Sequence, residues 1–241
     1  MKPKLNHLSQ PVGDMLKNWG PASIPQNSIL KGRFCRVEPL NIDSHMSDLY
    51  DAFTKDTANK IWTYLPYGPF DAEALFSNWM RNYCLSNDPM FFAIIDKASS
   101  KAVGMSSYLR IQSKIGLIEV GHINYSPFLQ RTIAGTEAMF LMMQNVFSKL
   151  GYRRYEWKCD SLNKASRRAA ERLGFTFEGT FRQATIYKQR NRDTSWYSIL
   201  DKHWSALEQA YLAWLASSNF DSNGQQKVKL GEMTNNIREK F

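Results

Sequence analysis

The sequence lacks the features that mark several classes of protein. Three cysteines, Cys35, Cys84 and Cys159, are far apart in 241 residues and form neither a disulfide framework nor a Cys-x-x-Cys motif. The four histidines are equally scattered, so we expect no metal site. No apolar run approaches the roughly 20 residues that a membrane span needs. Because the first residues also contain no apolar segment, we expect no secretory signal, no membrane partner and a cytoplasmic location.

Acidic residues are also scarce. There are 22 of them against 31 lysines and arginines, which gives a formal net charge of +9. This excess is compatible with a phosphate-bearing cofactor, with RNA or with a ribosome as partner. No nucleic-acid-binding motif accompanies the charge, so nucleic acid is an alternative that we do not favour. The hydrophobic share of 43% is enough for a folded core and excludes a disordered chain.

The chain divides into a body with an extension at each end. Residues 1–28 are rich in proline and glycine and predict an extended arm that lies on the body or hangs free. Residues 217–241 are polar and predict a weakly ordered tail. Between these extensions, we expect one domain over residues 29–204 and a C-terminal helix that includes residues 205–216.

Hydrophobic periodicity predicts an α/β protein. Early strands and helices pass into a meander of strands, after which the pattern becomes strand, helix, strand. This order predicts a mixed, mostly antiparallel sheet flanked by helices, with one β-α-β crossover. The expected strands are 34–40, 91–95, 102–112, 116–124, 153–159, 175–188 and 194–200, and the expected helices are 42–54, 72–85, 139–150, 163–173 and 203–215.

The first informative segment is Gln130-Arg-Thr-Ile-Ala-Gly135, which follows a strand that ends near Pro127. We expect a helix to begin near Gly135 and Thr136. Small residues at the start of a helix leave backbone amides free at its positive end, which suits a pyrophosphate, and Arg131 adds charge. The alternative is that Thr136 only caps the helix and Arg131 is a solvated charge.

The second segment is Asn163-Lys-Ala-Ser-Arg-Arg-Ala-Ala-Glu-Arg-Leu-Gly-Phe175, in which Asn163 is a good N-cap and Gly174 ends a helix. Together the two segments resemble the GCN5-related N-acetyltransferase (GNAT) family, in its ribosomal-protein N-terminal acetyltransferase-like (RimJ/RimL-like) branch. The resemblance covers about residues 29–204. In that family the loop reads Gln/Arg-x-x-Gly-x-Gly/Ala, and this chain departs from it at Ile133.

This resemblance implies the GNAT fold and acetyl-CoA as the donor. It also implies that the loop amides bind the pyrophosphate and that Asn163 and Ser166 lie beside the CoA arm, although Asn163 could equally be only an N-cap. The residues that the resemblance assigns to acetyl-CoA are His122, Ile123, Asn124, Gln130, Arg131, Thr132, Ile133, Ala134, Gly135, Thr136, Asn163 and Ser166.

A carboxylate, Glu119, stands inside the apolar strand Leu117-Ile-Glu-Val-Gly-His-Ile-Asn-Tyr125. Burial raises the pKa of a carboxylate and improves it as a base near neutrality. The alternative is a structural carboxylate paired with an arginine. The resemblance places this strand beside the thioester, with a bulge that Gly121 permits and whose amides hold the acyl oxygen.

The sequence offers several candidates for the proton donor and for the residues that surround the acceptor amine. Other GNAT branches use a tyrosine four residues before Gly174 to protonate the leaving thiolate, but this chain has Ala170 there. Ser166, solvent or another tyrosine such as Tyr125 would then serve. The resemblance also implies that Trp62, Tyr64 and Tyr67 join Glu119 in binding the acceptor amine, which aromatic rings can enclose. The alternative is that these rings only anchor a proline-rich loop.

We therefore expect an N-acetyltransferase that uses acetyl-CoA and a primary amine, either of a small molecule or of a protein N-terminus. The amine would attack directly in a ternary complex, because no cysteine lies in a recognised nucleophile motif with a histidine partner. The alternative function is a catalytically silent acyl-CoA-binding or RNA- or ribosome-binding module. The sequence is also compatible with a homodimer.

Overall fold

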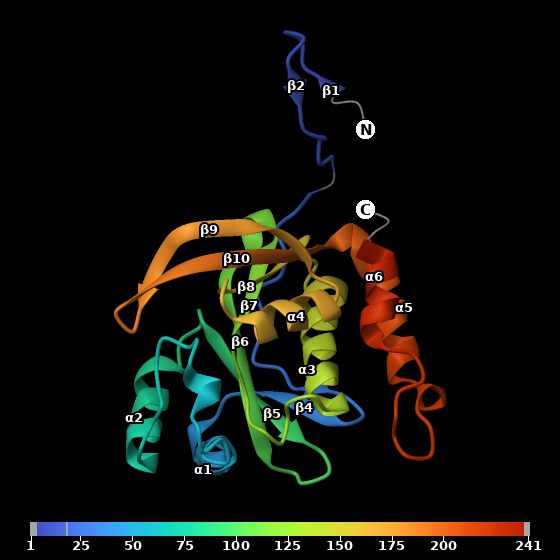
Figure 1. The fold of residues 1–241 in the computed structure, drawn as a ribbon. Coiled ribbons are helices and arrows are strands. Elements are labelled where there is room, and N and C mark those ends of the chain that lie inside the picture. The colour runs from blue at the N-terminus through green and yellow to red at the C-terminus, as the bar shows by residue number, and fades with distance from the viewer. Residues whose placement is uncertain (1–3, 18, 239–241) are drawn as a thin grey trace.

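An eight-stranded sheet forms the centre of the molecule (Figure 1). The computed structural model describes residues 4–17 and 19–238. The strands lie in the order β3-β4-β5-β6-β7-β8-β10-β9, and only β7 and β8 run parallel to one another. The mixed, mostly antiparallel sheet is thus confirmed. Its strands are β3 Leu30–Lys31, β4 Cys35–Pro39, β5 Met90–Asp96, β6 Ala102–Gln112, β7 Leu117–Tyr125, β8 Arg154–Asp160, β9 Thr176–Tyr187 and β10 Arg190–Leu200.

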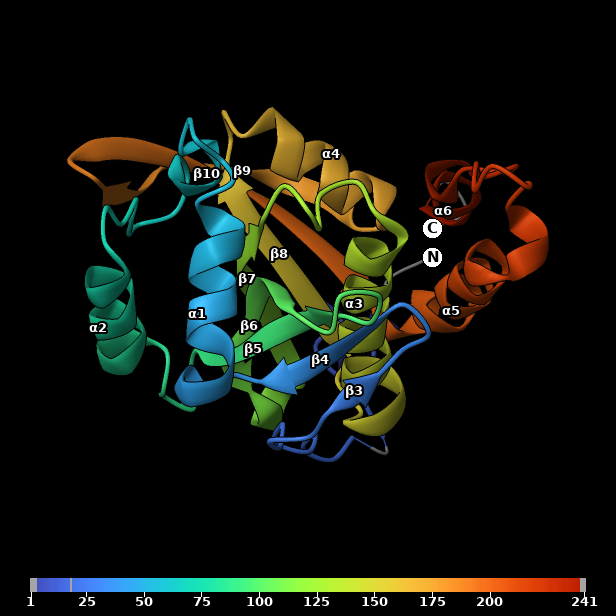
Figure 2. The same ribbon diagram turned by 90° about the horizontal axis from the view of Figure 1, so that it is seen from below.

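Helices cover both faces of the sheet (Figure 2). Helices α1 and α2 pack on one face, and α3, α4 and α5 share the core on the other. Helix α3 connects the parallel strands β7 and β8, which confirms the single β-α-β crossover. The helices are α1 Ile42–Phe53, α2 Glu73–Tyr83, α3 Ile133–Gln144, α4 Lys164–Arg172, α5 Asp201–Leu215 and α6 Leu230–Arg238, with a 3-10 turn at Lys60–Trp62 and a π-helical turn at Asn145–Lys149.

Strand β8 is buried on both faces, whereas its alternating sequence predicted a half-buried strand. Tyr155 and Trp157 face the core beneath α3 and α4. Glu156, with 2% of its surface exposed, points the other way together with Lys158. A buried polar face needs partners inside the protein, because unpaired buried charges are strongly unfavourable. On this face Lys158 lines the cleft described below, and Glu156 is one of its partners.

The C-terminal tail corrects an expectation. Residues 217–241 were expected to be weakly ordered, but they contain α6, in which Leu230 is fully buried. The hydroxyl of Thr234 donates a hydrogen bond of 3.0 Å to the carbonyl of Arg172, which anchors α6 to α4. The apolar stripe of this short helix was hidden by the polar segment before it. Residues 239–241 lie outside the described part of the chain.

The N-terminal arm begins with a small hairpin of β1 Lys4–Leu5 and β2 Pro11–Val12, which projects from the body (Figure 1). Further along, the amide of Ala22 donates to the carbonyl of Ser113 at 2.9 Å, so this part of the arm lies on the domain. Residues 1–3 and 18 of the expected arm fall outside the described residues. In the described ranges, no helix has the length and apolarity needed to cross a bilayer.

Candidate active site

A cleft opens where the two parallel strands separate. Strands β7 and β8 pair from Leu117 only as far as Val120, which lies opposite Trp157. Beyond that point β7 bulges against β6, and His122 takes a positive φ of 49°. The bulge was expected, but the left-handed residue is His122 and not Gly121. The resulting cleft has a volume of about 1390 Å³.

The loop before α3 forms one end of this cleft. Helix α3 begins at Ile133, two residues earlier than expected, because the Oγ1 of Thr132 accepts a hydrogen bond from the amide of Gly135 at 3.0 Å. Thr132 is therefore the cap, which corrects the expectation for Thr136. The amides of Ile133 and Ala134 have no hydrogen-bond partner within the described residues. Ile133 and Ala134 do not themselves line the cleft, whereas Thr132, Gly135 and Thr136 do. The two free amides lie at the positive end of the helix, where an anion binds favourably.

Helix α4 borders the same end. Asn163 is its N-cap and accepts a hydrogen bond of 3.0 Å from the amide of Ser166, and both residues line the cleft. Near the end of this helix, Arg172 donates to the Oγ1 of Thr136 at 3.2 Å. Burial lowers the pKa of Arg172, and the helix start beside it is also positive. This half-buried cation, like the neighbouring Arg131, points to an anionic ligand.

Acetyl-CoA fits these residues. Asn124 is 1% exposed, lines the cleft, and has no hydrogen-bond partner for its amide oxygen or nitrogen within the described chain. An unpaired buried amide is rare in a folded protein and matches the amide groups of a pantetheine arm. The free amides before α3 and the arginine beside them match a pyrophosphate. Gln130, whose side chain donates to the carbonyl of Tyr125, also lines this end, as do Ile123 and Gly135.

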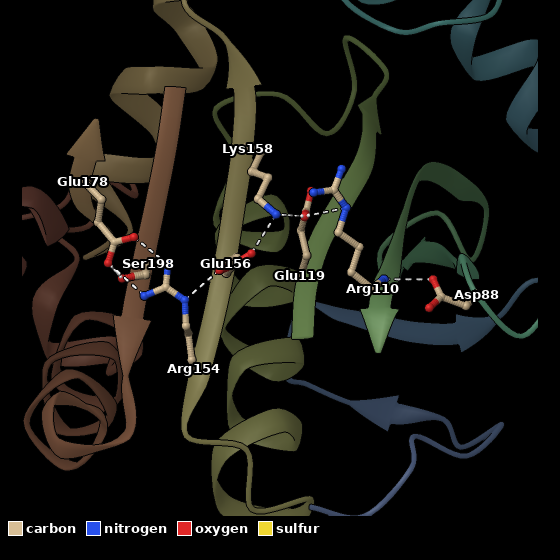
Figure 3. A network of polar contacts seen from close by, with 8 residues as sticks. All are labelled: Asp88, Arg110, Glu119, Arg154, Glu156, Lys158, Glu178 and Ser198. Carbon is tan, nitrogen blue, oxygen red and sulfur yellow. Dashed lines mark hydrogen bonds and ion pairs between the residues drawn. The ribbon is translucent and has the colours of Figure 1, made fainter. Parts of the chain in front are cut away.

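Glu119 lies in the middle of the cleft and is 4% exposed. Its Oε2 lies 2.8 Å from the Nζ of Lys158 and 3.5 Å from the Nε of Arg110 (Figure 3). Burial raises the pKa of this carboxyl, and the lysine and the arginine only partly oppose that effect. Glu119 thus combines the two expected properties, those of a base with a raised pKa and of a carboxylate in an ion pair.

Lys158 connects Glu119 to a longer network. Its Nζ also lies 2.7 Å from Glu156 and 3.7 Å from the ring centroid of Trp196. From Glu156 the contacts cross the sheet to β9 and β10 (Figure 3). From Glu156 they run through Arg154 to Glu178 and Ser198. From Glu119 they run to Arg110, whose backbone amide donates to Asp88.

Of the three aromatic residues expected to form the acceptor wall, Tyr64 lines the cleft, and its hydroxyl donates to the carbonyl of Leu162 at 3.3 Å. Trp62 and Tyr67 correct the expectation. Trp62 is 4% exposed and packs edge-on against Phe53 in the core below α1 and α2. The Tyr67 hydroxyl lies 3.0 Å from Nδ1 of His122, so Tyr67 fixes the loop to the bulge.

The structure also reduces the number of residues that could protonate the leaving thiolate. Ala170 is fully buried, so the position that holds a tyrosine in other branches offers no acid. The Tyr125 hydroxyl already donates to the carbonyl of Gly135 at 2.9 Å. The hydroxyl oxygen of Ser166 accepts from the indole of Trp157 at 3.0 Å and keeps its own proton to donate. Ser166 also hydrogen-bonds with the side chain of Cys159, and it is the remaining candidate among these residues.

Sequence reasoning missed several residues of the cleft. Lys158 lies on the polar side of an alternating strand, and no periodic signal marked it as buried. Asp160 accepts a hydrogen bond of 2.8 Å from the hydroxyl of Tyr187, which brings β9 to the end of β8. Arg192 of β10 enters the cleft from the same side. Their meeting depends on how the strands are ordered, which the sequence pattern does not contain.

Comparisons with known proteins agree with this architecture. The acetyltransferase (GNAT) domain profile matches residues 36–176. A GCN5-related N-acetyltransferase from Brucella melitensis is 50% identical, with a TM-score of 0.89, and the alignment covers 91% of this chain and 100% of that chain. The chain therefore belongs to the GNAT acetyltransferase family, whose members use acetyl-CoA.

Two further structures are similar. A protein described as a probable acetyltransferase of the GNAT family from Chromobacterium violaceum ATCC 12472 is 41% identical, with a TM-score of 0.76 and coverage of 82% of this chain and 98% of that one. The Microcin C7 self immunity acetyltransferase MccE, solved with acetyl-CoA and AMP, shares the fold at 20% identity, with a TM-score of 0.63 and coverage of 74% and 98%. No curated protein matched.

In the described residues, no group of histidine, cysteine or acidic side chains is arranged to hold a metal ion.

Proposed function

We propose that the protein transfers the acetyl group of acetyl-CoA to a primary amine, by direct attack of the amine in a ternary complex. One observation carries this proposal. The cleft between the separated strands β7 and β8 is lined by a buried carboxylate, Glu119, whose pKa is raised, and by Arg131 and Arg172, which suit phosphates, and two free amides lie at the start of α3. A primary amine is largely protonated near neutrality, so it needs a base before it can attack.

When bound, acetyl-CoA supplies the activated acyl group. The amides of Ile133 and Ala134 and the guanidinium of Arg172 would bind its phosphates, and Asn124 would hold the pantetheine arm. Glu119 would take a proton from the acceptor ammonium, directly or through water. A backbone amide at the bulge would donate to the acyl oxygen, and Ser166 would give a proton to the departing thiolate.

The finer assignment to the RimJ/RimL-like branch is part of this proposal. It depends on the segment from Gln130 to Thr136 and on the helix that begins after Asn163. A protein N-terminus and a small-molecule amine both satisfy the chemistry at Glu119. The silent binding module is the second candidate, and the buried Ala170 in place of a tyrosine favours it.

Calorimetric titration with acetyl-CoA is the first experiment. We expect one site of micromolar affinity, which weakens in Asn163→Ala. Because that change also removes a helix cap worth about 1 kcal/mol, Asn163→Ser keeps the cap and separates the two effects. Absence of binding to the folded protein would contradict the assignment of the cofactor.

Release of free CoA with a panel of amines then separates an enzyme from a binding module. We expect the rate to fall as the pH drops through the raised pKa of Glu119, and Glu119→Gln to remove both the rate and this limb. The matched control is Glu73→Gln, which changes an exposed glutamate of α2. Binding without turnover for every amine would favour the silent module.

Replacement of all three buried cysteines should leave turnover largely intact, and a trapped acetyl-cysteine would disprove direct transfer.

A further inference from the structure

The carboxylates that line the cleft all have partners in the protein. They are Asp56, Glu119 and Asp160. Each therefore already compensates a charge or a hydrogen-bond donor of the protein, and Glu119 is assigned to the reacting amine. Asp56 accepts from the amide of Ile61, Asp160 accepts from the amide of Leu162 and the hydroxyl of Tyr187, and Glu119 pairs with Lys158 and Arg110.

Unlike these carboxylates, the cleft residue Arg192 has no partner of opposite charge within the described residues. It lines the cleft from β10, forms no ion pair within the described residues, and its buried Nε has no hydrogen-bond partner there. Its guanidinium lies 5.8 Å from the ring centroid of Tyr187. Its charge, after burial, lowers the pKa of His122 to about 4, so it acts on the bulge. Arg192 is thus a cation in the cleft whose anion is missing from the chain.

The phosphates of the cofactor do not account for Arg192. The groups suited to them are the free amides of Ile133 and Ala134 and the guanidinium of Arg172, all at the start of α3. Arg192 instead contacts Tyr187, whose hydroxyl is bonded to Asp160 on the charged face of β8. This is the face on which Glu119 and Lys158 also lie.

We propose that the acceptor is a small primary amine that carries a carboxylate or a phosphate, and that Arg192 binds this anionic group. A guanidinium offers a planar fork that matches either anion with two hydrogen bonds. This inference rests on the proposed function. Glu119 first takes one proton from the ammonium group of the acceptor. The nitrogen then forms a bond to the acetyl carbon and the carbon–sulfur bond breaks. The second proton that the nitrogen loses reaches the departing sulfur through the Ser166 hydroxyl, so CoA leaves as the thiol.

Pairs of amines with and without the anionic group provide the test. They are glycine against glycinamide, and O-phosphoethanolamine against ethanolamine. Hydrogen bonds to charged groups contribute about 1.5–3 kcal/mol, so kcat/KM for one anionic member should exceed that of its partner about 10- to 100-fold. The pair with the larger ratio identifies the anion. In Arg192→Gln that ratio should collapse toward one, and Arg192→Lys should restore part of it.

The control is Arg190→Gln, an exposed arginine two residues away on the same strand that does not line the cleft. It should keep the wild-type ratio. Calorimetry should give the same acetyl-CoA affinity for Arg192→Gln as for the wild type. A weakened affinity would assign Arg192 to the cofactor and overturn the inference.

Two further outcomes would also overturn it. One is a wild-type preference for the neutral amines, for polyamines or for peptide N-termini. The other is an anionic preference that survives in Arg192→Gln. If no amine is acetylated, the proposed function fails separately. Titration of glycine and O-phosphoethanolamine into both proteins then decides: binding that Arg192→Gln abolishes supports the anion site, and no binding to the wild type rejects it.

Discussion

The two ends of the cleft are built in different ways. The end at the start of α3 combines two free backbone amides with Arg131, Arg172 and Asn124 of β7, whose buried amide has no partner within the described residues. The end around Glu119 consists of charged side chains that are paired with one another across β6, β7 and β8. At the first end, polar groups of the protein lack hydrogen-bond partners. At the second end, nearly every charged side chain is paired with a side chain of opposite charge.

This difference explains what each end can recognise. Backbone amides at a helix start bind phosphate whatever side chains surround them, provided that the local turn is kept. A network of paired charges is specific, because replacing one member leaves another buried charge without compensation. A fold can therefore keep one donor and change its acceptors by substitutions around Glu119 alone.

The largest expected effect is on stability, and it comes from removing the cation that Glu119 and Glu156 share. In Lys158→Met the side chain keeps its length over Trp196, but Glu119 and Glu156 lose their shared cation. We expect a loss of about 3–5 kcal/mol in the free energy of unfolding at pH 7, as measured by urea denaturation. Burial already raises the folded-state pKa of Glu119, and without the lysine that opposes this effect the pKa should rise further. The loss should therefore shrink as the pH is lowered.

Lys101→Met is the matched control. Lys101 lies 3.6 Å from Asp48 in a pair that is largely exposed, so its removal should change stability by less than about 1 kcal/mol. Equal effects of the two substitutions would show that burial does not strengthen the network around Glu119.

The next effect concerns His122, which lies between the two ends. Its backbone makes the bulge, and burial and Arg192 lower the pKa of its side chain to about 4. Because the folded-state pKa lies below the unfolded value, the contribution of His122 is complete above pH 6.5 and is lost as the pH falls toward 4. The loss is at most about 3 kcal/mol.

His122→Gln keeps a group that can hydrogen-bond to Tyr67 and removes the titration. Stability measured from pH 7 to pH 4 should therefore fall less steeply in this variant than in the wild type. His7→Gln, in the exposed arm, should leave the slope unchanged. Parallel slopes in all three proteins would contradict a neutral, buried His122.

The same difference between the two ends explains what the sequence could predict. Asn163 and Gly135 act on residues within a few positions, so their motifs could predict helix starts close to those that we propose bind the cofactor. The register that sets Glu119 beside Glu156, and so brings Lys158 to Glu119, depends on β7 and β8 running parallel. No periodicity in either strand contains that register.

The acceptor wall and the tail show the same limit. Trp62 and Tyr64 are two residues apart in a loop without periodicity, and only packing decides that Trp62 faces the core. The start of α3 was misplaced by two residues because Thr132 and Thr136 are both plausible caps. Helix α6 was missed because its stability comes from α4, to which Thr234 is bonded.

A smaller effect tests the backbone end. A Cβ added at Gly135 would lie 2.6 Å from the carbonyl oxygen of Leu129, so Gly135→Ala must displace the loop. We expect a loss of about 1–3 kcal/mol in stability and a roughly tenfold weaker acetyl-CoA affinity by calorimetry. Gly231→Ala is the control, since its Cβ would be 3.8 Å from Arg172 and the residue lies in α6. It should stabilise the protein by about 0.5–1 kcal/mol.

The smallest expected effect has opposite signs in the free and the bound protein. Asn124 is buried with its amide unpaired, and an unsatisfied buried polar group is unfavourable by about 1–3 kcal/mol. Asn124→Leu should therefore raise the stability of the ligand-free protein by about 1 kcal/mol and weaken acetyl-CoA binding about tenfold. Denaturation and calorimetry on the same protein measure both. Lower stability with unchanged affinity would show that Asn124 serves the fold, and the comparison between an open cofactor end and a matched acceptor end would no longer hold.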